Sequence, residues 1–289
     1  MRRHRHITDC LLGLLGLVIL LGGCGQFSQP AKPATSTSIT AKTGARYIPT
    51  LFFHGYGSHA SAEMQMIHAA TAAGVTRTVV HATVTKTGRV IWQGHFKRGD
   101  YHPLVAVEFK DNRNTDYQVT ANWAQKVITG LARTYHIQKF NLVGHSMGNI
   151  TLLTYLLKRN TDRQMPRPQK WVAIAGNFNG VLGGNDTSQQ QTRDQSRRLQ
   201  TPPNDYRRLA ARRAYFPRQV AVLNIYGELN DKTRSDGRVS NASSRSLRLL
   251  VQKRAKSYQV RKIMGANAQH SRLHDNQQVD QLLLKFLWP

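Results

Sequence analysis

From residue 50 to the end of the chain, short apolar runs alternate with segments whose apolar residues recur every three or four positions. The apolar runs predict buried β-strands at 50–55, 104–109, 140–143, 171–175, 220–226 and 258–264. The helical periodicity predicts helices at 61–73, 116–135, 149–159, 246–251 and 276–288. Residues 78–85 and 89–95 alternate polar and apolar positions around a short turn, which predicts a β-hairpin. Strands that alternate with helices predict an α/β fold with a mostly parallel central sheet and helices on both faces.

One polar segment interrupts this pattern. Residues 177–218 are rich in Gln, Arg, Asn and Thr and contain Pro202-Pro203, with helical patches near 189–199 and 206–216. A long polar insertion between two strands is typical of a mobile loop or of a lid over a functional site. We therefore predict one folded domain, 47–289, with a lid-like insertion at 177–218.

The N-terminal segment has a different pattern. A basic start precedes the apolar run Leu11–Leu21, whose 11 residues are fewer than the ~20 that a membrane span needs, so residues 1–23 predict an export signal. Leu21-Gly-Gly-Cys24 resembles a bacterial lipobox and predicts lipidation of Cys24; the alternative is an ordinary export signal cleaved nearby. Residues 24–46, rich in Ser, Thr, Pro and Lys, predict a flexible tether. The protein is expected on the outer face of the cytoplasmic membrane or at the cell surface.

Composition narrows the functional classes. The chain has 41 Lys and Arg against 15 Asp and Glu, a formal net charge of +26. These basic residues are scattered rather than interleaved with aromatic residues, and no nucleic-acid-binding motif is present, so anionic membranes or cell-wall polymers are the expected partners. Both cysteines, Cys10 and Cys24, precede the domain. The domain therefore contains no disulfide framework, zinc ribbon, iron–sulfur cluster or cysteine nucleophile.

The most informative motif is Gly144-His-Ser146-Met-Gly148. A serine hydroxyl is a poor nucleophile, so an enzyme that uses one must expose it beside a base. A sharp turn from strand to helix exposes the serine in this way, and it crowds the positions two before and two after it, where glycine fits. Here an apolar strand precedes the motif and a predicted helix follows it. Ser146 is therefore the predicted nucleophile.

The base and the acid follow from their order in the chain. Where the serine lies on such a turn, the acid and then the histidine come after it. Of 12 histidines only His270 and His274 follow Ser146, and His270, on the loop after a predicted strand, is the better candidate. The candidates for the acid lie after the strand at 220–226: Asp236, beside Gly237, with Asp231 and Glu228 as open alternatives.

The oxyanion formed during attack requires backbone N–H donors that are already in position. Met147, directly after the nucleophile, provides one predicted donor. The turn His54-Gly-Tyr-Gly57 after the first strand provides the other, and Tyr56 is the predicted residue. His54 is expected to hold this turn by hydrogen bonds and not to transfer protons. No cofactor and no metal are needed for this chemistry.

Several stretches together resemble a known family. They are His54–Gly57, 105–112, 140–148, 177–180, 235–239 and 268–274. Over 47–289 the chain resembles the α/β-hydrolases, and more narrowly the DUF915 family of bacterial cell-surface hydrolases. The resemblance implies an α/β-hydrolase fold. Similarity to small bacterial lipases around Ser146, Asp236 and His270 supports these three residues as the triad. The chain departs from the family pattern at Asn149, which directly follows Gly148 at a position where a second glycine is common.

These observations predict a serine hydrolase that cleaves a small-molecule or lipid carboxylic ester through an acyl-enzyme. Two alternatives stay open at this stage. One is a catalytically weak or inactive hydrolase fold that binds anionic envelope polymers, and the other is an acyltransferase. The sequence does not predict an oligomeric state.

Overall fold

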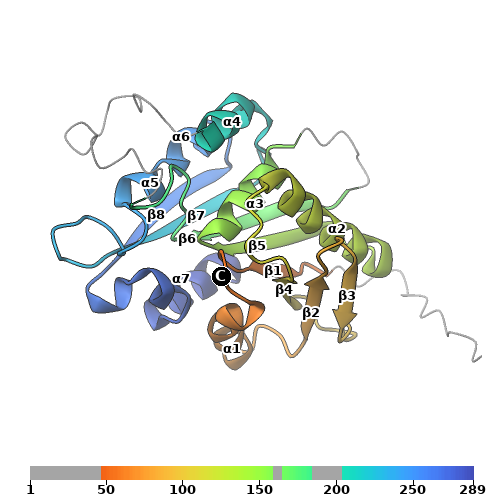
Figure 1. The fold of residues 1–289 in the computed structure, drawn as a ribbon. Helices are drawn as coiled ribbons and strands as arrows, with labels where there is room; N and C mark the ends of the chain where they lie inside the picture. The colour runs from red at the N-terminus through yellow and green to blue at the C-terminus, as the bar shows by residue number, and fades with distance from the viewer. Residues whose placement is uncertain (1–46, 159–164, 184–203) are drawn as a thin grey trace, which may run out of the picture. The chain divides into compact units, whose positions relative to one another are not determined.

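The computed structural model describes residues 47–158, 165–183 and 204–289 (Figure 1). The predicted signal (1–23), Cys24, the tether (24–46) and the middle of the predicted lid lie outside these residues. Every described element belongs to one unit, Ala41–Pro289.

A single eight-stranded sheet forms the centre of this unit, in the order β3-β2-β4-β1-β5-β6-β7-β8. The strands are β1 (Thr50–Phe53), β2 (Val79–Val84), β3 (Val90–Gln93), β4 (Leu104–Phe109), β5 (Lys139–His145), β6 (Arg167–Ile174), β7 (Ala221–Glu228) and β8 (Ser257–Met264). Only β3 runs antiparallel to its neighbour, β2, as the predicted hairpin requires. The other pairs are parallel, which confirms the predicted fold class.

Helices cover both faces of the sheet (Figure 1). The α-helices are α1 (Met64–Ala72), α2 (Tyr117–Tyr135), α3 (Met147–Leu156), α4 (Asn204–Arg212), α5 (Asn241–Arg245), α6 (Leu247–Val251) and α7 (Gln277–Leu287). The 3₁₀ turns are η1 (Ala60–Glu63), η3 (Arg213–Tyr215), η4 (Ala266–Ala268) and η5 (His270–His274). None of the helices in the described ranges is both long and apolar enough to cross a bilayer.

Two hydrophobic clusters lie on opposite faces of the sheet. In β1, Leu51 and Phe53 belong to the cluster beneath α2 and α3, while Phe52 belongs to the cluster beneath α1 and α7. Side chains of a strand alternate between faces, so a strand covered on both sides must be apolar at nearly every position. This is why the central strands could be predicted from continuous apolar runs.

The starts of several helices differ slightly from the predicted ranges. The carboxylate of Asp116 accepts hydrogen bonds from the backbone N–H groups of Gln118 and Val119, and Asn276 caps α7 in the same way. The helix predicted at 149–159 begins two residues earlier, at Met147, because the turn at Ser146 leads directly into α3. The helix predicted at 61–73 begins as the 3₁₀ turn η1.

The second described part of the insertion, which begins at residue 204, is helical over 204–215. Tyr206 and Leu209 of α4 are buried, and the Tyr206 hydroxyl lies 3.5 Å from the backbone oxygen of Ser246, next to α6. This agrees with the helical patch predicted at 206–216. The patch predicted at 189–199 lies outside the described residues, and the role of 177–218 as a lid stays a prediction.

Candidate active site

Ser146 lies at the end of β5 in a strained turn. Its φ and ψ are 52° and −124°, a backbone conformation that residues other than glycine rarely adopt. Helix α3 starts at the next residue. A Cβ atom on Gly148 would lie 2.5 Å from the carbonyl oxygen of Phe53, and one on Gly144 would lie 2.6 Å from Oδ1 of Asn149. Both glycines are therefore needed for close packing, as predicted from the motif.

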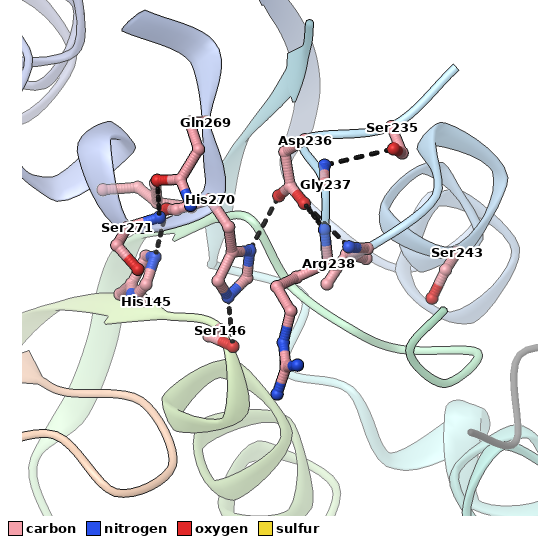
Figure 2. A network of polar contacts seen from close by, with 12 residues as sticks. His145, Ser146, Ser235, Asp236, Gly237, Arg238, Ser243, Gln269, His270 and Ser271 are labelled. Carbon is pink, nitrogen blue, oxygen red and sulfur yellow. Dashed lines mark hydrogen bonds and ion pairs between the residues drawn. The ribbon is translucent and has the colours of Figure 1, made fainter. Parts of the chain in front are cut away.

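The structure brings Ser146, His270 and Asp236 together (Figure 2). The Ser146 hydroxyl lies 2.9 Å from Nε2 of His270, and Nδ1 of His270 lies 2.8 Å from Oδ2 of Asp236. All three residues are buried, with exposed fractions of 9%, 8% and 1%. With Nδ1 donating to the carboxylate, the neutral imidazole presents a lone pair at Nε2 to the serine hydroxyl. This is the order of contacts that a general base requires.

The loop after β7 fixes the carboxylate of Asp236. Its Oδ1 accepts hydrogen bonds from the backbone N–H groups of Arg238 (2.9 Å) and Val239 (2.7 Å). Gly237 has a φ of +87°, which glycine adopts without strain, and this lets the loop turn around the carboxylate. The backbone N–H of His270 also donates to the carbonyl of Asp236 at 2.8 Å. Oδ2 is therefore left to face the imidazole.

The other candidates for acid and base make different contacts. Asp231 is exposed and accepts hydrogen bonds from the backbone and the hydroxyl of Thr233. Glu228 pairs with Asn241 and Lys262. His274 packs its ring edge-on against His145, at 4.8 Å between centroids. Among the open alternatives, Asp236 is the carboxylate in contact with His270.

Tyr56 and Met147, the predicted oxyanion donors, line one cleft together with Ser146 and His270. The turn that carries Tyr56 lies against the nucleophile, because a Cβ atom on Gly55 would be 3.0 Å from Cβ of Ser146. In the described part of the chain, neither backbone N–H has a hydrogen-bond acceptor. Both are therefore available to an oxygen bound in the cleft.

His54 has the structural role expected of it. Its Nε2 accepts a hydrogen bond from the backbone N–H of Phe109 at 3.0 Å, which leaves Nδ1–H to donate to the carbonyl of Gly55 at 2.9 Å. Burial lowers the pKa of the His54 imidazole, so the neutral ring is favoured. The ring thereby joins β4 to the turn that carries Tyr56.

His145 is a site residue that the sequence reasoning did not find. Its Nε2 donates a hydrogen bond to the backbone carbonyl of His270 at 3.0 Å, and the two rings lie 4.9 Å apart between centroids. Burial, together with the neighbouring His270 and His274, lowers the pKa of the His145 imidazole well below its usual range. Selection of the base by chain order set His145 aside. Its place beside the nucleophile, at the end of a buried strand, was the available signal.

The cleft above these residues has a volume of about 580 Å³. Its apolar lining includes Met147, Ile150, Phe178 and Val181, and its polar lining includes Asn177 and Gln269. Within the described ranges, no three His, Cys, Asp or Glu side chains gather as a ligand set for a metal ion. The lining is mixed, since tyrosine, hydroxyl and charged side chains also contribute to it, and a concave site of this size can hold a small organic molecule.

The fold and the strained turn at Ser146 define an α/β-hydrolase. Residues 37–289 match the family described as "Alpha/beta hydrolase of unknown function (DUF915)". The chain belongs to that family, which confirms the resemblance found in the sequence. No curated protein matches the sequence.

Solved structures agree with this assignment. The crystal structure of the gene lin2722 product of Listeria innocua has a TM-score of 0.77 and 25% identity, over 84% of this chain and 94% of that one. The structure described as "the putative cell surface hydrolase from Lactobacillus plantarum WCFS1" has a TM-score of 0.69 and 22% identity, over 84% and 92% of the two chains. The second structure supports the fold alone.

Proposed function

We propose that this α/β-hydrolase is a serine esterase that cleaves carboxylic esters through a Ser146–His270–Asp236 triad. One observation carries the proposal: the continuous chain of contacts from the Ser146 hydroxyl through His270 to Asp236, at 2.9 Å and 2.8 Å, at the edge of a cleft. Each member is presented by a separate loop, and the carboxylate faces the imidazole nitrogen remote from the serine.

The geometry supports the following sequence of steps. The Ser146 oxygen attacks the ester carbonyl as its proton moves to Nε2 of His270, and Asp236 stabilises the resulting imidazolium. The negative charge on the carbonyl oxygen is held by the backbone N–H groups of Tyr56 and Met147. His270 then protonates the departing alkoxide, leaving an acyl group on Ser146. Water, deprotonated by His270, releases the acid and restores the serine.

The cleft favours an acyl ester over a peptide substrate. Met147, directly after the nucleophile, and Ile150, one helical turn further along, contribute apolar side chains to the lining that suit an alkyl chain. Lipid esters and small soluble esters are the proposed substrate class.

The experiment compares turnover of 4-nitrophenyl butyrate by the purified protein and by two serine variants. Ser146→Ala removes the nucleophile. Ser271→Ala is a matched control, because Ser271 also lines the cleft but its hydroxyl forms no hydrogen bond with His270 or Asp236 in the described structure. We expect Ser146→Ala to lose at least about 10³-fold in kcat and Ser271→Ala to stay within severalfold of the unmodified protein. Equal turnover by Ser146→Ala would contradict the proposal.

We further propose that the protein is exported and anchored through a lipid on Cys24. The support is the basic start, the short apolar run and the Leu21-Gly-Gly-Cys24 sequence. In a bacterial host, high salt should release the Cys24→Ala protein from the membrane fraction, whereas the unmodified protein should stay there. Continued membrane association that resists high salt would contradict the lipid anchor.

A further inference from the structure

Arg238 is the one lysine or arginine among the described residues that line the cleft. It lies two residues after Asp236, within the stretch 235–239 that contributed to the family resemblance. The sequence alone assigns Arg238 no role. Figure 2 shows its side chain extending from the Asp236 loop past His270 toward the level of Ser146.

The backbone of Arg238 is fixed although its side chain is exposed. Its N–H donates to Oδ1 of Asp236 at 2.9 Å, and its carbonyl accepts a hydrogen bond from the N–H of Leu182 at 2.9 Å. The guanidinium makes no hydrogen bond or ion pair with any described residue. The Arg238 guanidinium therefore extends from a backbone that is held in place beside the triad, and no described residue neutralises its positive charge.

Asp205, the acidic residue among the described lining residues, forms no ion pair with Arg238. Its carboxylate lies 3.7 Å from the guanidinium of Arg208 instead. The chain as a whole carries a formal charge of +26, so its field also attracts anions. A guanidinium binds carboxylate and phosphate groups with paired, charge-assisted hydrogen bonds.

We propose that Arg238 binds an anionic group of the substrate, a carboxylate or a phosphate, close to the ester bond that Ser146 attacks. This inference rests on the proposed esterase function and specifies its substrate class: acidic esters in preference to neutral ones. Arg238 is a specificity residue, and no step of the bond cleavage passes through it.

The test uses two pairs of esters that differ in charge and little in shape. In the first pair the acyl group carries the charge: 4-nitrophenyl hydrogen adipate against 4-nitrophenyl 6-methylheptanoate. In the second pair the leaving group carries it: 4-carboxyphenyl butyrate against 4-carbamoylphenyl butyrate. The measured quantity is the ratio of kcat/KM for the anionic ester to kcat/KM for its neutral partner, and the pair with the larger ratio shows on which side of the ester the anion lies.

Three variants of the purified protein complete the design. We expect Arg238→Gln, which keeps the backbone N–H bonded to Asp236, to lower the ratio about tenfold in at least one pair. Arg238→Lys, which keeps the charge, should retain most of the ratio. Arg234→Gln removes an exposed charge from the same loop outside the cleft and should leave the ratio unchanged.

The outcomes separate this inference from the function on which it rests. If the neutral esters are hydrolysed and Arg238→Gln leaves the anionic-to-neutral ratio of kcat/KM unchanged, the inference is overturned and the esterase proposal stands. An equal fall of the ratio in Arg234→Gln would assign the preference to the overall charge and would also overturn it. Absence of turnover for all four esters would contradict the proposed function and the inference together.

Discussion

Asp236 shares its two carboxylate oxygens between different tasks. Oδ1 is bonded to two backbone N–H groups of its own loop, and Oδ2 is bonded to Nδ1 of His270. We predict that Asp236→Asn lowers kcat by about 10³- to 10⁴-fold, because the amide cannot stabilise the imidazolium and favours the wrong tautomer of the ring. Steady-state kinetics with a 4-nitrophenyl ester measures this loss.

The two rival carboxylates provide the controls. Asp231→Asn and Glu228→Gln change side chains whose partners are Thr233, and Asn241 and Lys262, respectively. Both variants should keep kcat within severalfold of the unmodified protein. A loss in either variant as large as that of Asp236→Asn would contradict the choice of Asp236.

His145 holds the backbone of His270 through one hydrogen bond at 3.0 Å. We predict that His145→Leu lowers kcat about tenfold or more with a smaller change in KM, because the base loses a support that fixes its position. His145→Gln places an amide N–H near the former Nε2 and should recover part of the loss. Equal activity of the Leu variant and the unmodified protein, with the same pH profile, would show that the bond has no positioning role.

Single residues also show what the sequence could not provide. Chain order and loop position were enough to propose Ser146 and His270, which the structure places in contact, since only two histidines follow the serine. Three carboxylates follow one strand within nine positions, so the choice of acid depended on the path of the loop. The structure supplies that path through the turn at Gly237 and the bond between His270 N–H and Asp236 carbonyl.

At the scale of elements, the junction of β5 and α3 depends on the absence of a side chain at Gly148. A Cβ atom there would lie 2.5 Å from the carbonyl oxygen of Phe53 and 2.7 Å from that of His54, both in the backbone. We predict that Gly148→Ala destabilises the protein by about 1–3 kcal/mol, because α3 must shift away from β1. Chemical denaturation measures the change.

Gly99 is the matched glycine for that experiment. It has a φ of +81°, but a Cβ atom there would meet no heavy atom within 4 Å. Gly99→Ala should therefore cost about 1 kcal/mol through backbone strain alone. A smaller loss for Gly148→Ala than for Gly99→Ala would contradict the packing argument.

Glu63, at the junction of η1 and α1, makes stability depend on pH. Its side chain is fully buried, neither carboxylate oxygen has a hydrogen-bond partner among the described residues, and burial raises its pKa from 4.5 to about 8. The folded state thus binds a proton that the unfolded state releases above pH 4.5. The contribution of this group to stability falls as pH rises from about 4.5 to about 8.

Glu63→Gln should remove this dependence. Relative to the unmodified protein, the variant should gain up to about 1.4 kcal/mol in free energy of unfolding for each pH unit in that interval. Urea denaturation at pH 5, 6.5 and 8 gives the comparison. Parallel pH curves for the two proteins would contradict the buried, protonated state.

The elements that could be predicted best are the strands that are buried on both faces and the helices that are buried along one apolar stripe. The central strands and α2 have patterns that follow directly from burial. The 3₁₀ turn η1 and the split of the helix near 246 into α5 and α6 carry no such pattern, because local capping and tertiary packing decide them. The fold class was therefore predictable, while element boundaries required the structure.

At the scale of the whole molecule, charge is the dominant property. About +24 of the formal charge of +26 would remain after removal of residues 1–23. We predict that the unlipidated Cys24→Ser protein sediments with vesicles that contain anionic lipid and not with zwitterionic vesicles at 0.1 M salt. Raising the salt to 1 M shortens the Debye length from about 10 Å to about 3 Å and should abolish binding. Retention at 1 M salt would contradict an electrostatic association.

The account depends on a reactive hydroxyl at Ser146, and covalent labelling with a fluorophosphonate tests this most directly. The purified protein, its Ser146→Ala variant and its Ser271→Ala variant are treated with the probe, and the adduct is mapped by peptide mass spectrometry. The account predicts one adduct, on the peptide containing Ser146, in the unmodified protein and in Ser271→Ala, and none in Ser146→Ala. Failure to label Ser146, or labelling that persists in Ser146→Ala, would contradict it.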